Sequence, residues 1–552
     1  MINRIKTAVA TALCLGLFGS IHVMADELEA DVVVYGDASG GVTAAVQAAR
    51  MGKSVILVSQ YGHLGGMSSS GLGLTDIGND RILGGISRDF YHRLYLHYQK
   101  PDAWRHQKRD TFQNIGQGIP ALNPKTELAS TFEPKVAESV FDALVKEAGV
   151  KLVHGRVALK SGIVKSGTRI TAIRLENGIT IKGRVFIDAS YEGDLLPGAG
   201  VSFVVGRESN SEFNEWSNGN TGVARKNQLP NGIDPYVVKG DPSSGLLAGV
   251  NPDQGAEKGG GDKHLQSYCY RMVLTDVAAN RLLIPKPSNY NETHYEILFR
   301  AIEAGQHNRF FKLSPMPNRK TDSNNNGGIS TDYIGYNYGK DWNWSTLNYK
   351  QRQELASLHR DWQLGLVWTL QNHLRVPEAI RKQYAKWGLP QDEFTDNHHW
   401  PYNIYVREAR RMRSDFVMTE DHCKRKLPVA DPIGMGAYTL DSHNTQRFVH
   451  NGMVKNEGDI QSYIGGKAYG IAYRAIVPPA DECENLLVPW ALSATHIAFG
   501  SIRMEPVFMI LGQSAATAAC IAIDHDCSVQ TVPYNRLRKR LIADGQKLEA
   551  PR

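Results

Sequence analysis

The stretch 31–73 is DVVVYGDASGGVTAAVQAARMGKSVILVSQYGHLGGMSSSGLG. It begins with an apolar run short enough for a buried strand and passes through a glycine-rich turn into an alanine-rich segment, which predicts a helix. A second apolar run at 55–58 predicts another buried strand. This strand–turn–helix–strand order is typical of a dinucleotide-binding unit, in which the helix N-terminus offers free N–H groups to phosphates.

The turn has the residue types that such a unit needs. Gly36 allows a tight turn, Ala38 in the usual second-glycine place leaves room for a pyrophosphate, and Gly41 allows helix and strand to pack closely. The predicted phosphate-binding residues are Gly36, Ala38, Gly40 and Gly41. At the end of the second strand, Ser59 and Gln60 stand where an acidic residue usually holds the adenosine ribose.

A second segment rich in glycine and serine follows the second strand. It suits FAD better than a nicotinamide cofactor, because the ribityl chain and ring of a flavin lie against open backbone. The predicted contacts there are Gly65, Gly66, Met67, Ser68 and Gly71. His63 is a candidate for covalent flavin attachment or a loop residue on the phosphate side, and a plain surface loop is the alternative for the whole segment.

Composition bounds the class of protein. The chain has 552 residues, which suggests two to three domains, and its 42% hydrophobic and 21% charged content is ordinary for a globular protein. The formal net charge of +6 comes from scattered Lys and Arg residues rather than from basic blocks. This distribution argues against a nucleic-acid surface.

The first 25 residues are predicted to be a secretory signal peptide. Arg4 and Lys6 precede an apolar run at 8–18, and the small-residue pattern 23–25 places cleavage after Ala25. We therefore expect a periplasmic or secreted protein, with an uncleaved anchor as the alternative. No segment of the mature chain is expected to cross a bilayer.

The cysteines indicate no metal site. Five remain after the signal peptide, so at least one is unpaired, and none forms a Cys-x-x-Cys pair. Neither an iron–sulfur cluster nor a zinc site of ordinary ligand spacing is predicted.

Further along the chain, the pattern predicts a helix over 134–148, a strand at 151–153 followed by Val157 as a cofactor contact, a hairpin layer over 161–181 and a buried strand at 185–190. Near the other end, 485–492 is strand-like. A small-residue helix at 512–519 has an N-terminus that is expected to face the flavin, with Gly512 and Gln513 as contacts, although tight core packing explains it equally. The cofactor domain is thus expected to combine residues 29–200 and 460–552 around an insertion at 201–459.

Residues 186–194, FIDASYEGD, resemble the D-A-T-G-D-G-D strand of flavoproteins with the glutathione-reductase-type FAD fold, with Ser190 and Tyr191 in place of Thr and Gly. Other stretches in the same order resemble a family of FAD-dependent oxidoreductases, some of them labelled xanthan-lyase-like: 199–201, 205–208, 266–272, 324–332, 405–412, 434–436, 441–444, 493–496 and 501–506. The resemblance implies an α/β fold, with a Rossmann-like FAD-binding domain and a large inserted α+β substrate domain. It also adds Ala189 and Ser190 to the cofactor contacts.

A flavin that oxidises an alcohol or amine needs a base for the proton. His443 is the first candidate, oriented by Asp441, and His496 beside the small-residue helix is the second. Arg503 and Arg271 are candidates for binding an anionic group. Tyr268 is a candidate donor to a substrate oxygen. For each of these five, a purely structural role is the alternative.

Two more arginines belong to the same hypothesis. On a helix, Arg407 and Arg411 would lie one turn apart and bind a carboxylate, and a solvated face would look the same.

The sequence therefore predicts an FAD-dependent oxidoreductase acting on a small polar substrate, such as a sugar or uronic acid, by hydride transfer. Tryptophans in the insertion suit sugar rings or, alternatively, core packing: Trp342, Trp344, Trp362, Trp368, Trp387 and Trp400. The alternatives are a fumarate-reductase-like C=C reductase with Arg503 as proton donor, a polysaccharide lyase, and a carbohydrate-binding protein with a structural flavin. The electron acceptor is left open.

Overall fold

The computed structural model describes residues 27–117, 119–333 and 343–550. The predicted signal peptide and Trp342 lie outside the described residues. The fold is α/β and is organised around a seven-stranded sheet of order β5-β2-β1-β8-β7-β6, with β23 paired to β8. The strands are β1 (Glu27–Tyr35), β2 (Val55–Ser59), β5 (Lys151–His154), β6 (Ile163–Ser166), β7 (Arg169–Arg174), β8 (Thr180–Asp188) and β23 (Leu486–Leu487).

The centre of this sheet is parallel and buried, which is why its strands are continuous apolar runs rather than alternating ones. In β1, Val32 to Tyr35 pair with β2 on one side and with β8 on the other. The predicted hairpin layer is present: β6 and β7 are antiparallel, and β7 joins the sheet through β8. Because β23 pairs with β8, the C-terminal part of the chain contributes a strand to the same sheet.

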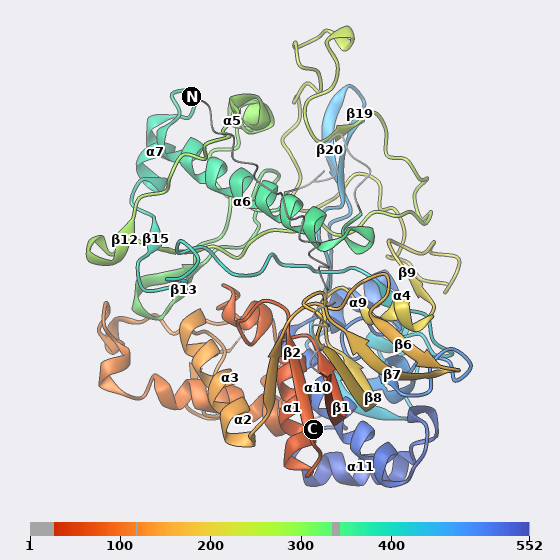
Figure 1. Cartoon of the computed structure of the whole chain (residues 1–552). Coiled ribbons are helices and arrows are strands. Elements are labelled where there is room, and N and C mark those ends of the chain that lie inside the picture. Colours follow the sequence, from red (N-terminus) through yellow and green to blue (C-terminus); the bar gives the residue numbers. More distant parts are fainter. Residues whose placement is uncertain (1–26, 118, 334–342, 551–552) are drawn as a thin grey trace, which may run out of the picture.

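The two ends of the sequence also meet through helices. In Figure 1 the red N-terminal elements and the blue C-terminal elements lie together below the insertion. Helix α1 (Ser39–Arg50) packs so closely on α10 (Glu505–Asp524) that a Cβ on Gly512 would lie 2.0 Å from the carbonyl oxygen of Gly40. The Thr43 hydroxyl adds a 2.8 Å bond to the carbonyl of Met509.

Two expectations about α10 are corrected. The helix begins at Glu505 rather than near Gly512, because Pro506 and the apolar residues after it form its first turns; Gly512 is therefore a mid-helix packing residue. Among the described residues, α10 alone is long and apolar enough to cross a membrane, whereas we expected no such segment. It is fully buried, and buried core helices of globular proteins meet the same criteria.

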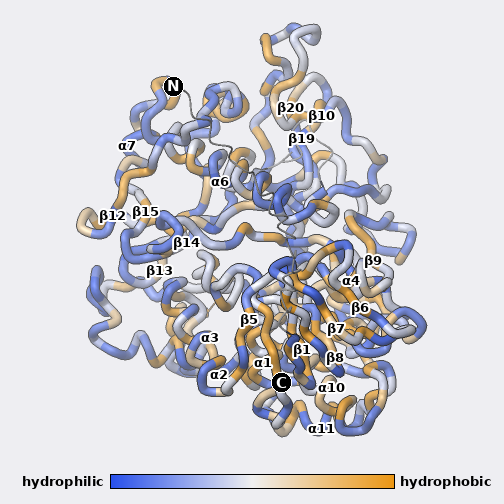
Figure 2. Tube along the Cα trace, viewed as in Figure 1, coloured by the Kyte–Doolittle hydropathy of each residue, from blue (hydrophilic) through white to orange (hydrophobic). Residues whose placement is uncertain are grey.

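The insertion covers one end of the sheet, and its long helix α6 crosses above the strand ends (Figure 1). The other helices are α2 (Gly85–His97), α3 (Pro134–Ala148), α4 (Leu195–Ala199), α5 (Glu296–Glu303), α6 (Tyr349–Asn372), α7 (Glu378–Tyr384), α8 (Glu420–Cys423), α9 (His496–Ile502) and α11 (Tyr534–Ala543). The predicted helix at 134–148 is confirmed. Figure 2 shows the hydrophobic residues concentrated in the central strands and in α10.

Small sheets complete the fold, most of them in the insertion. They pair β3 (Leu122–Asn123) with β4 (Leu128–Ala129), β9 (Phe203–Val204) with β16 (Arg411–Met412), β12 (Arg281–Leu282) with β15 (Leu389–Pro390), β17 (Pro432–Gly436) with β22 (Tyr469–Ala472), and β18 (Leu440–Ser442) with β21 (Ile460–Ser462). Two three-stranded sheets are β10 (Val250–Asn251), β19 (Gln446–His450), β20 (Met453–Glu457), and β11 (Val273–Thr275), β14 (Lys320–Asp322), β13 (Ser314–Met316).

The predicted helix carrying Arg407 and Arg411 is absent. Residues 405–410 have no helical structure, and Arg411 begins strand β16. The reason is that each guanidinium pairs with a different buried carboxylate: Arg407 with Asp332 at 2.9 Å and Arg411 with Glu208 at 2.7 Å. These long-range ion pairs outweigh the helical propensity of a short segment.

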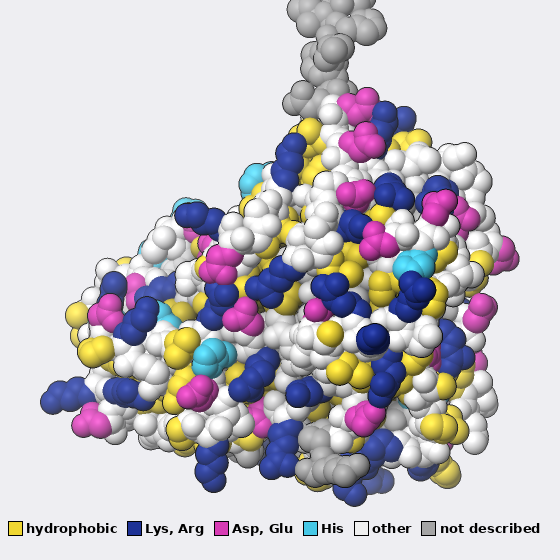
Figure 3. Space-filling model, turned by 90° about the horizontal axis from the view of Figure 1, so that it is seen from below, with side chains coloured by type: hydrophobic (Ala, Val, Ile, Leu, Met, Phe, Trp, Pro, Cys, Tyr) yellow, Lys and Arg dark blue, Asp and Glu magenta, His cyan; other side chains and the backbone are white. Residues whose placement is uncertain are grey.

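Two further features are the state of the cysteines and the distribution of surface charge. The five cysteines within the described residues are all free. On the face shown in Figure 3, Lys and Arg side chains are spread among acidic ones rather than gathered into one patch.

Candidate active site and cofactor cleft

The glycine-rich turn after β1 forms a tight cradle at the start of α1. Gly36 has φ +113°, and a Cβ there would lie 2.6 Å from the carbonyl carbon of Ala189. A Cβ on Gly41 would lie 1.9 Å from the carbonyl oxygen of Gly36. Ala38 is the N-cap and provides no side-chain hydrogen bond, so the first N–H groups of α1 are left for another acceptor.

The second glycine-rich segment lies against this turn. Gly65 and Gly66 have left-handed backbone conformations, and Gly66 begins a short 3-10 helix, η1 (Gly66–Ser69). The Met67 N–H donates to the Tyr191 hydroxyl at 2.7 Å. The hydroxyls of Ser68 and Ser70 are buried and have no hydrogen-bond partner among the described residues. Buried polar groups usually have a hydrogen-bond partner, so these two hydroxyls are available to bond to a ligand.

At the end of β2, a carboxylate is supplied by Asp37 of the glycine-rich turn rather than by the strand itself. The Ser59 hydroxyl donates to Asp37 at 2.7 Å, and the N–H of Tyr61 donates to the same Asp37 oxygen at 2.9 Å. Gln60 donates to the hydroxyl of Tyr35 at 2.6 Å. The carboxylate at this strand end thus comes from the glycine-rich turn, and the sequence analysis did not single it out.

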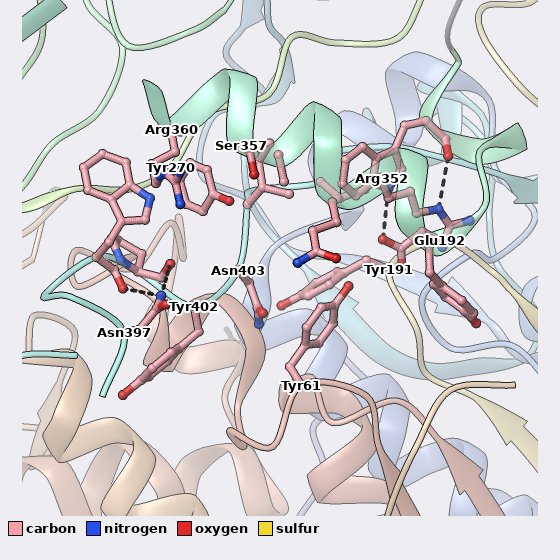
Figure 4. A pocket seen from close by; sticks show the side chains of 18 of the residues that line it. Tyr61, Tyr191, Glu192, Tyr270, Arg352, Ser357, Arg360, Asn397, Tyr402 and Asn403 are labelled. Atoms are coloured by element: carbon pink, nitrogen blue, oxygen red, sulfur yellow. Dashed lines mark hydrogen bonds between the residues drawn. The ribbon is translucent and has the colours of Figure 1, made fainter. Parts of the chain in front are cut away.

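A cleft of about 270 Å³, here called the α6 cleft, lies between α6 and the carboxyl ends of the parallel strands. In Figure 4, Tyr61 rises from the sheet side, while Arg352 of α6 and Glu192 after β8 line the opposite wall. Glu192 is 1% exposed; its Oε1 accepts from the Trp344 indole at 3.0 Å, and its Oε2 has no partner among the described residues. Burial raises the pKa of this carboxyl.

The other predicted cofactor residues after β5 and β8 lie beside the same strand ends. The Val157 N–H donates to the Tyr35 hydroxyl at 3.1 Å, and its carbonyl accepts from Tyr349 at 3.0 Å. Ala189 donates to the carbonyl of Tyr35 at 2.8 Å. Ser190 donates to Asp188 at 2.6 Å.

Gly512 and Gln513 occupy the interface between helices instead. The Gln513 side chain accepts from the N–H of Ile86 at 2.9 Å and donates to Gln47 at 3.2 Å. Both residues therefore position α1 and α2 from behind the cradle.

A second hollow of about 620 Å³, here the polar cavity, brings three predicted catalytic residues together: His443, Arg271 and Arg503. Its lining includes Tyr405, whereas the next residue, Val406, lines the α6 cleft. One backbone segment therefore separates the two hollows. The second glycine-rich segment touches the cavity wall, because a Cβ on Gly71 would lie 1.8 Å from the carbonyl oxygen of Arg271.

His443 lies between two carboxylates. Its Nδ1 is 2.6 Å from Asp332 Oδ2, and its Nε2 is 3.4 Å from Asp441 Oδ2. Burial and the charge of Arg407 disfavour the imidazolium, but Asp332 and Asp441 outweigh them and raise the pKa of His443. Burial alone would raise the pKa of Asp332, but Arg407 and His443 lower it to about 2.

The arginines of the cavity share an aromatic partner. Arg503 donates to the Tyr405 hydroxyl and to Asp441, both at 2.9 Å, and Arg271 forms a two-point pair with Asp322 at 2.6 and 2.7 Å. Both arginines are 2% exposed. Their guanidinium carbons lie 5.8 and 6.0 Å from the centroid of the Tyr405 ring, within the range of a cation–π contact.

The remaining predicted catalytic residues do not line this cavity. His496 begins α9, where its Nδ1 is 2.8 Å from Glu408 and its Nε2 is 3.0 Å from Ser442, so both ring nitrogens are engaged. The Tyr268 hydroxyl donates to the carbonyl of Glu408, and its ring packs edge-on against Trp344. These residues support the wall behind His443.

His63 and the tryptophans lie elsewhere. His63 is 2.7 Å from Glu138 and stacks on Tyr402, with ring centroids 3.4 Å apart. Trp344 and Trp400 line the α6 cleft rather than the polar cavity. Trp362, Trp368 and Trp387 pack in or against the hydrophobic core.

One cluster of carboxylates, Glu133, Asp392 and Glu393, has the spacing of a metal site. Its centre is taken by the ammonium group of Lys320, which lies 2.7 Å from Glu133, 2.9 Å from Asp392 and 2.5 Å from Glu393. The cluster therefore forms a buried ion-pair network around a lysine.

Comparison with known families gives a match over most of the chain. The model of the family described as "FAD dependent oxidoreductase" matches residues 31–541. The chain belongs to this family of FAD-dependent oxidoreductases.

Similarity to solved structures is partial. An L-proline dehydrogenase from P. horikoshii is 18% identical with a TM-score of 0.22, over 33% of this chain and 59% of that one. A 3-ketosteroid-delta4-(5alpha)-dehydrogenase from Rhodococcus jostii RHA1 is 15% identical with a TM-score of 0.19, over 33% of this chain and 50% of that one. AlpK is 18% identical with a TM-score of 0.23, over 33% of this chain and 35% of that one. The chain thus spans about a third to three fifths of these structures, and no curated protein matches it.

The site fits the FAD that the family uses. The cradle has no room for a side chain at Gly36 or Gly41, and the start of α1 offers N–H groups to a phosphate. The unpartnered hydroxyls of Ser68 and Ser70 and the free oxygen of Glu192 offer hydrogen bonds to a long polar cofactor. These residues would hold FAD, which supplies hydride-accepting chemistry when it is bound.

For this flavoenzyme, sequence reasoning missed Asp37, Asp332 and Tyr405 as site residues. Asp332 and Tyr405 belong to stretches that resemble the family, so their motifs were visible, but their roles were not. The separation of 111 positions between Asp332 and His443 in the sequence hid their contact.

Proposed function

We propose that this FAD-dependent oxidoreductase oxidises a small polar substrate carrying a carboxylate, with uronic acids as the candidate class. The observation that carries the proposal is the polar cavity, where His443, held by Asp332, lies with two buried arginines. FAD, when bound, would accept a hydride from the substrate carbon. The chain's own residues supply the base and the charge that orients the substrate.

In this proposal His443 acts as the base. With its Nδ1–H directed at Asp332, its Nε2, which lies 3.4 Å from Asp441, is the nitrogen that accepts the hydroxyl proton. The two carboxylates then stabilise the imidazolium that forms, as the raised pKa of His443 indicates. Loss of the hydride from the substrate carbon and of the proton from its hydroxyl converts the alcohol into a carbonyl product.

Arg271 and Arg503 supply anion recognition. Each already has a carboxylate partner, so a substrate carboxylate would add to an existing ion pair rather than replace it. Guanidinium groups suit this task because they present several donors in one plane.

The test is anaerobic mixing of the holoprotein with D-galacturonate or D-glucuronate, with D-galactose and D-glucose as neutral controls. The proposal expects the flavin absorbance to bleach with the acids and far more slowly with the neutral sugars. If neutral sugars bleach the flavin as fast as the acids do, Arg271 and Arg503 do not select a substrate carboxylate. Binding without bleaching by any sugar would favour the lyase or the carbohydrate-binding protein.

A C=C reductase is a second candidate, supported by the placement of Arg503. This arginine is buried, lines the cavity and is held by Tyr405 and Asp441, as a fixed proton donor would be. Rapid reoxidation of the prereduced protein by fumarate, together with no bleaching by uronates, would favour this reaction.

We also propose a periplasmic or secreted location, supported by the pattern at residues 4–25. N-terminal sequencing of the protein from its native host tests this. A mature chain beginning at Asp26 is expected, and an intact Met1 terminus would contradict cleavage.

A further inference from the structure

The polar cavity has two kinds of cationic side chain. Arg271 and Arg503 are buried, and each is paired with a carboxylate. A second group is exposed to solvent and lines the same cavity; we call these residues the rim cations: Arg225, Lys226, Arg309 and Lys312. The difference in burial places the first pair deep in the cavity and the rim cations at its mouth.

The rim cations have no acidic partner in the described part of the chain, where none of them lies within 4.0 Å of a carboxylate. Their contacts are to neutral amides: Arg309 donates to Asn326 at 3.0 and 3.1 Å, and Lys226 lies 3.5 Å from Gln461. Positive charges gathered without counter-charges repel one another, and an anionic ligand would relieve that repulsion.

The acidic residues that line the cavity do not balance this charge. Six Lys or Arg residues line it against two Asp residues, Asp76 and Asp441. Asp441 is already bound by Arg503 and lies beside His443. The cavity therefore presents an excess of positive charge to solvent.

Hydrogen bonds hold the two rim segments together. The Lys312 N–H donates to the carbonyl of Asn324 at 2.8 Å, and the Gly327 N–H donates to the Asn227 side chain at 2.9 Å. The loop 324–327 thus ties residues 225–228 to residues 309–312. These hydrogen bonds fix the two segments that carry the rim cations relative to each other.

We propose that the rim cations form a second anionic subsite, and that the substrate carries at least two carboxylates, as a short oligomer of a uronic acid does. This inference rests on the proposed function, because it takes the polar cavity as the substrate site. A volume of about 620 Å³ lies within the range of pockets that enclose drug-sized ligands. One acidic group would bind near Arg271 and Arg503, and the next would reach the rim.

The experiment measures binding of D-galacturonate and of trigalacturonate to the holoprotein by calorimetry. Four forms are compared: wild type, Arg225→Gln/Lys226→Gln, Arg309→Gln/Lys312→Gln, and the control Lys146→Gln/Lys151→Gln, which alters two exposed lysines outside the cavity. All the altered side chains are exposed, so the variants should fold, and their melting temperatures check this.

In wild type and control, the trimer should bind about tenfold more tightly than the monomer, and added salt should reduce this advantage. Each rim variant should weaken trimer binding about three- to tenfold and leave monomer binding within about twofold of wild type. Equal losses for monomer and trimer, an unchanged trimer affinity, or no binding of either acid would overturn the inference.

Failure of the proposed function gives a different result. Rim-dependent trimer binding without flavin bleaching would retain the anionic subsite and reject the oxidation. Bleaching by D-galacturonate, with trimer binding unaffected by the rim variants, would retain the oxidation and reject the subsite.

Discussion

His443 Nδ1 lies 2.6 Å from Oδ2 of Asp332, although the two residues are 111 positions apart in the sequence. The contact sets the tautomer of the imidazole and directs its other nitrogen toward the cavity side, where Asp441 lies. The whole proton-transfer hypothesis depends on this pair.

Replacing Asp332 by Asn should move the pH dependence of the reaction. Activity needs neutral His443, so it is lost as the pH falls through the raised pKa of that imidazole. Without the Asp332 charge the pKa of His443 should fall, and the acidic limb of kcat/KM should shift about one unit to lower pH.

The companion variant is Asp441→Asn. It should shift the acidic limb of kcat/KM to lower pH as well, but by less. Asp441 lies 3.4 Å from the His443 ring, whereas Asp332 lies 2.6 Å from it. A limb that stays in place or moves to higher pH in Asp332→Asn would contradict the assignment of His443 as base.

Removing Arg271 should destabilise the fold. In Arg271→Met, Asp322 keeps a buried charge with no cationic partner, at a cost of about 3–5 kcal/mol. Thermal unfolding should show a clearly lower melting temperature. The double variant Arg271→Met/Asp322→Asn should recover part of the loss, and an unchanged melting temperature in the single variant would show that the pair is not needed for stability.

The buried serines should separate cofactor binding from folding. In Ser68→Ala/Ser70→Ala, two buried hydroxyls without partners are removed, so the apoprotein should melt no lower than wild type. FAD affinity, measured by flavin fluorescence quenching, should fall about two- to twelvefold for each hydrogen bond lost.

Ser87→Ala is the matched control for that experiment. Its hydroxyl is also buried without a partner among the described residues, but it lies on α2, outside both glycine-rich segments. FAD affinity should be unchanged in this variant. Equal FAD affinity in wild type and in Ser68→Ala/Ser70→Ala would show that these hydroxyls do not contact the cofactor.

The cofactor fold was predictable from sequence because its signals are local. The strand at 32–35, the glycine turn and the helix after it are adjacent along the chain, and each has a direct physical reason in its residue types. The helix at 134–148 was equally clear, since Pro134 opens it and its apolar residues follow a helical spacing.

The candidate site was less predictable because its contacts are long-range. The segment 405–412 looks helical in isolation, yet Arg407 and Arg411 bind carboxylates far away in sequence and fix an extended backbone. The sequence ranked His443 first and His496 second as bases, but it did not show their surroundings: His443 lines a cavity, and His496 is bonded at both ring nitrogens.

The most direct test of the account is a single turnover of the holoprotein with D-galacturonate under anaerobic conditions, comparing wild type with His443→Gln. His450→Gln, on strand β19, is the control. With equal FAD content in all three, the flavin should bleach about 10²–10⁴-fold more slowly in His443→Gln and at the wild-type rate in the control. Bleaching of His443→Gln at the wild-type rate would contradict the central claim that this histidine takes the substrate proton.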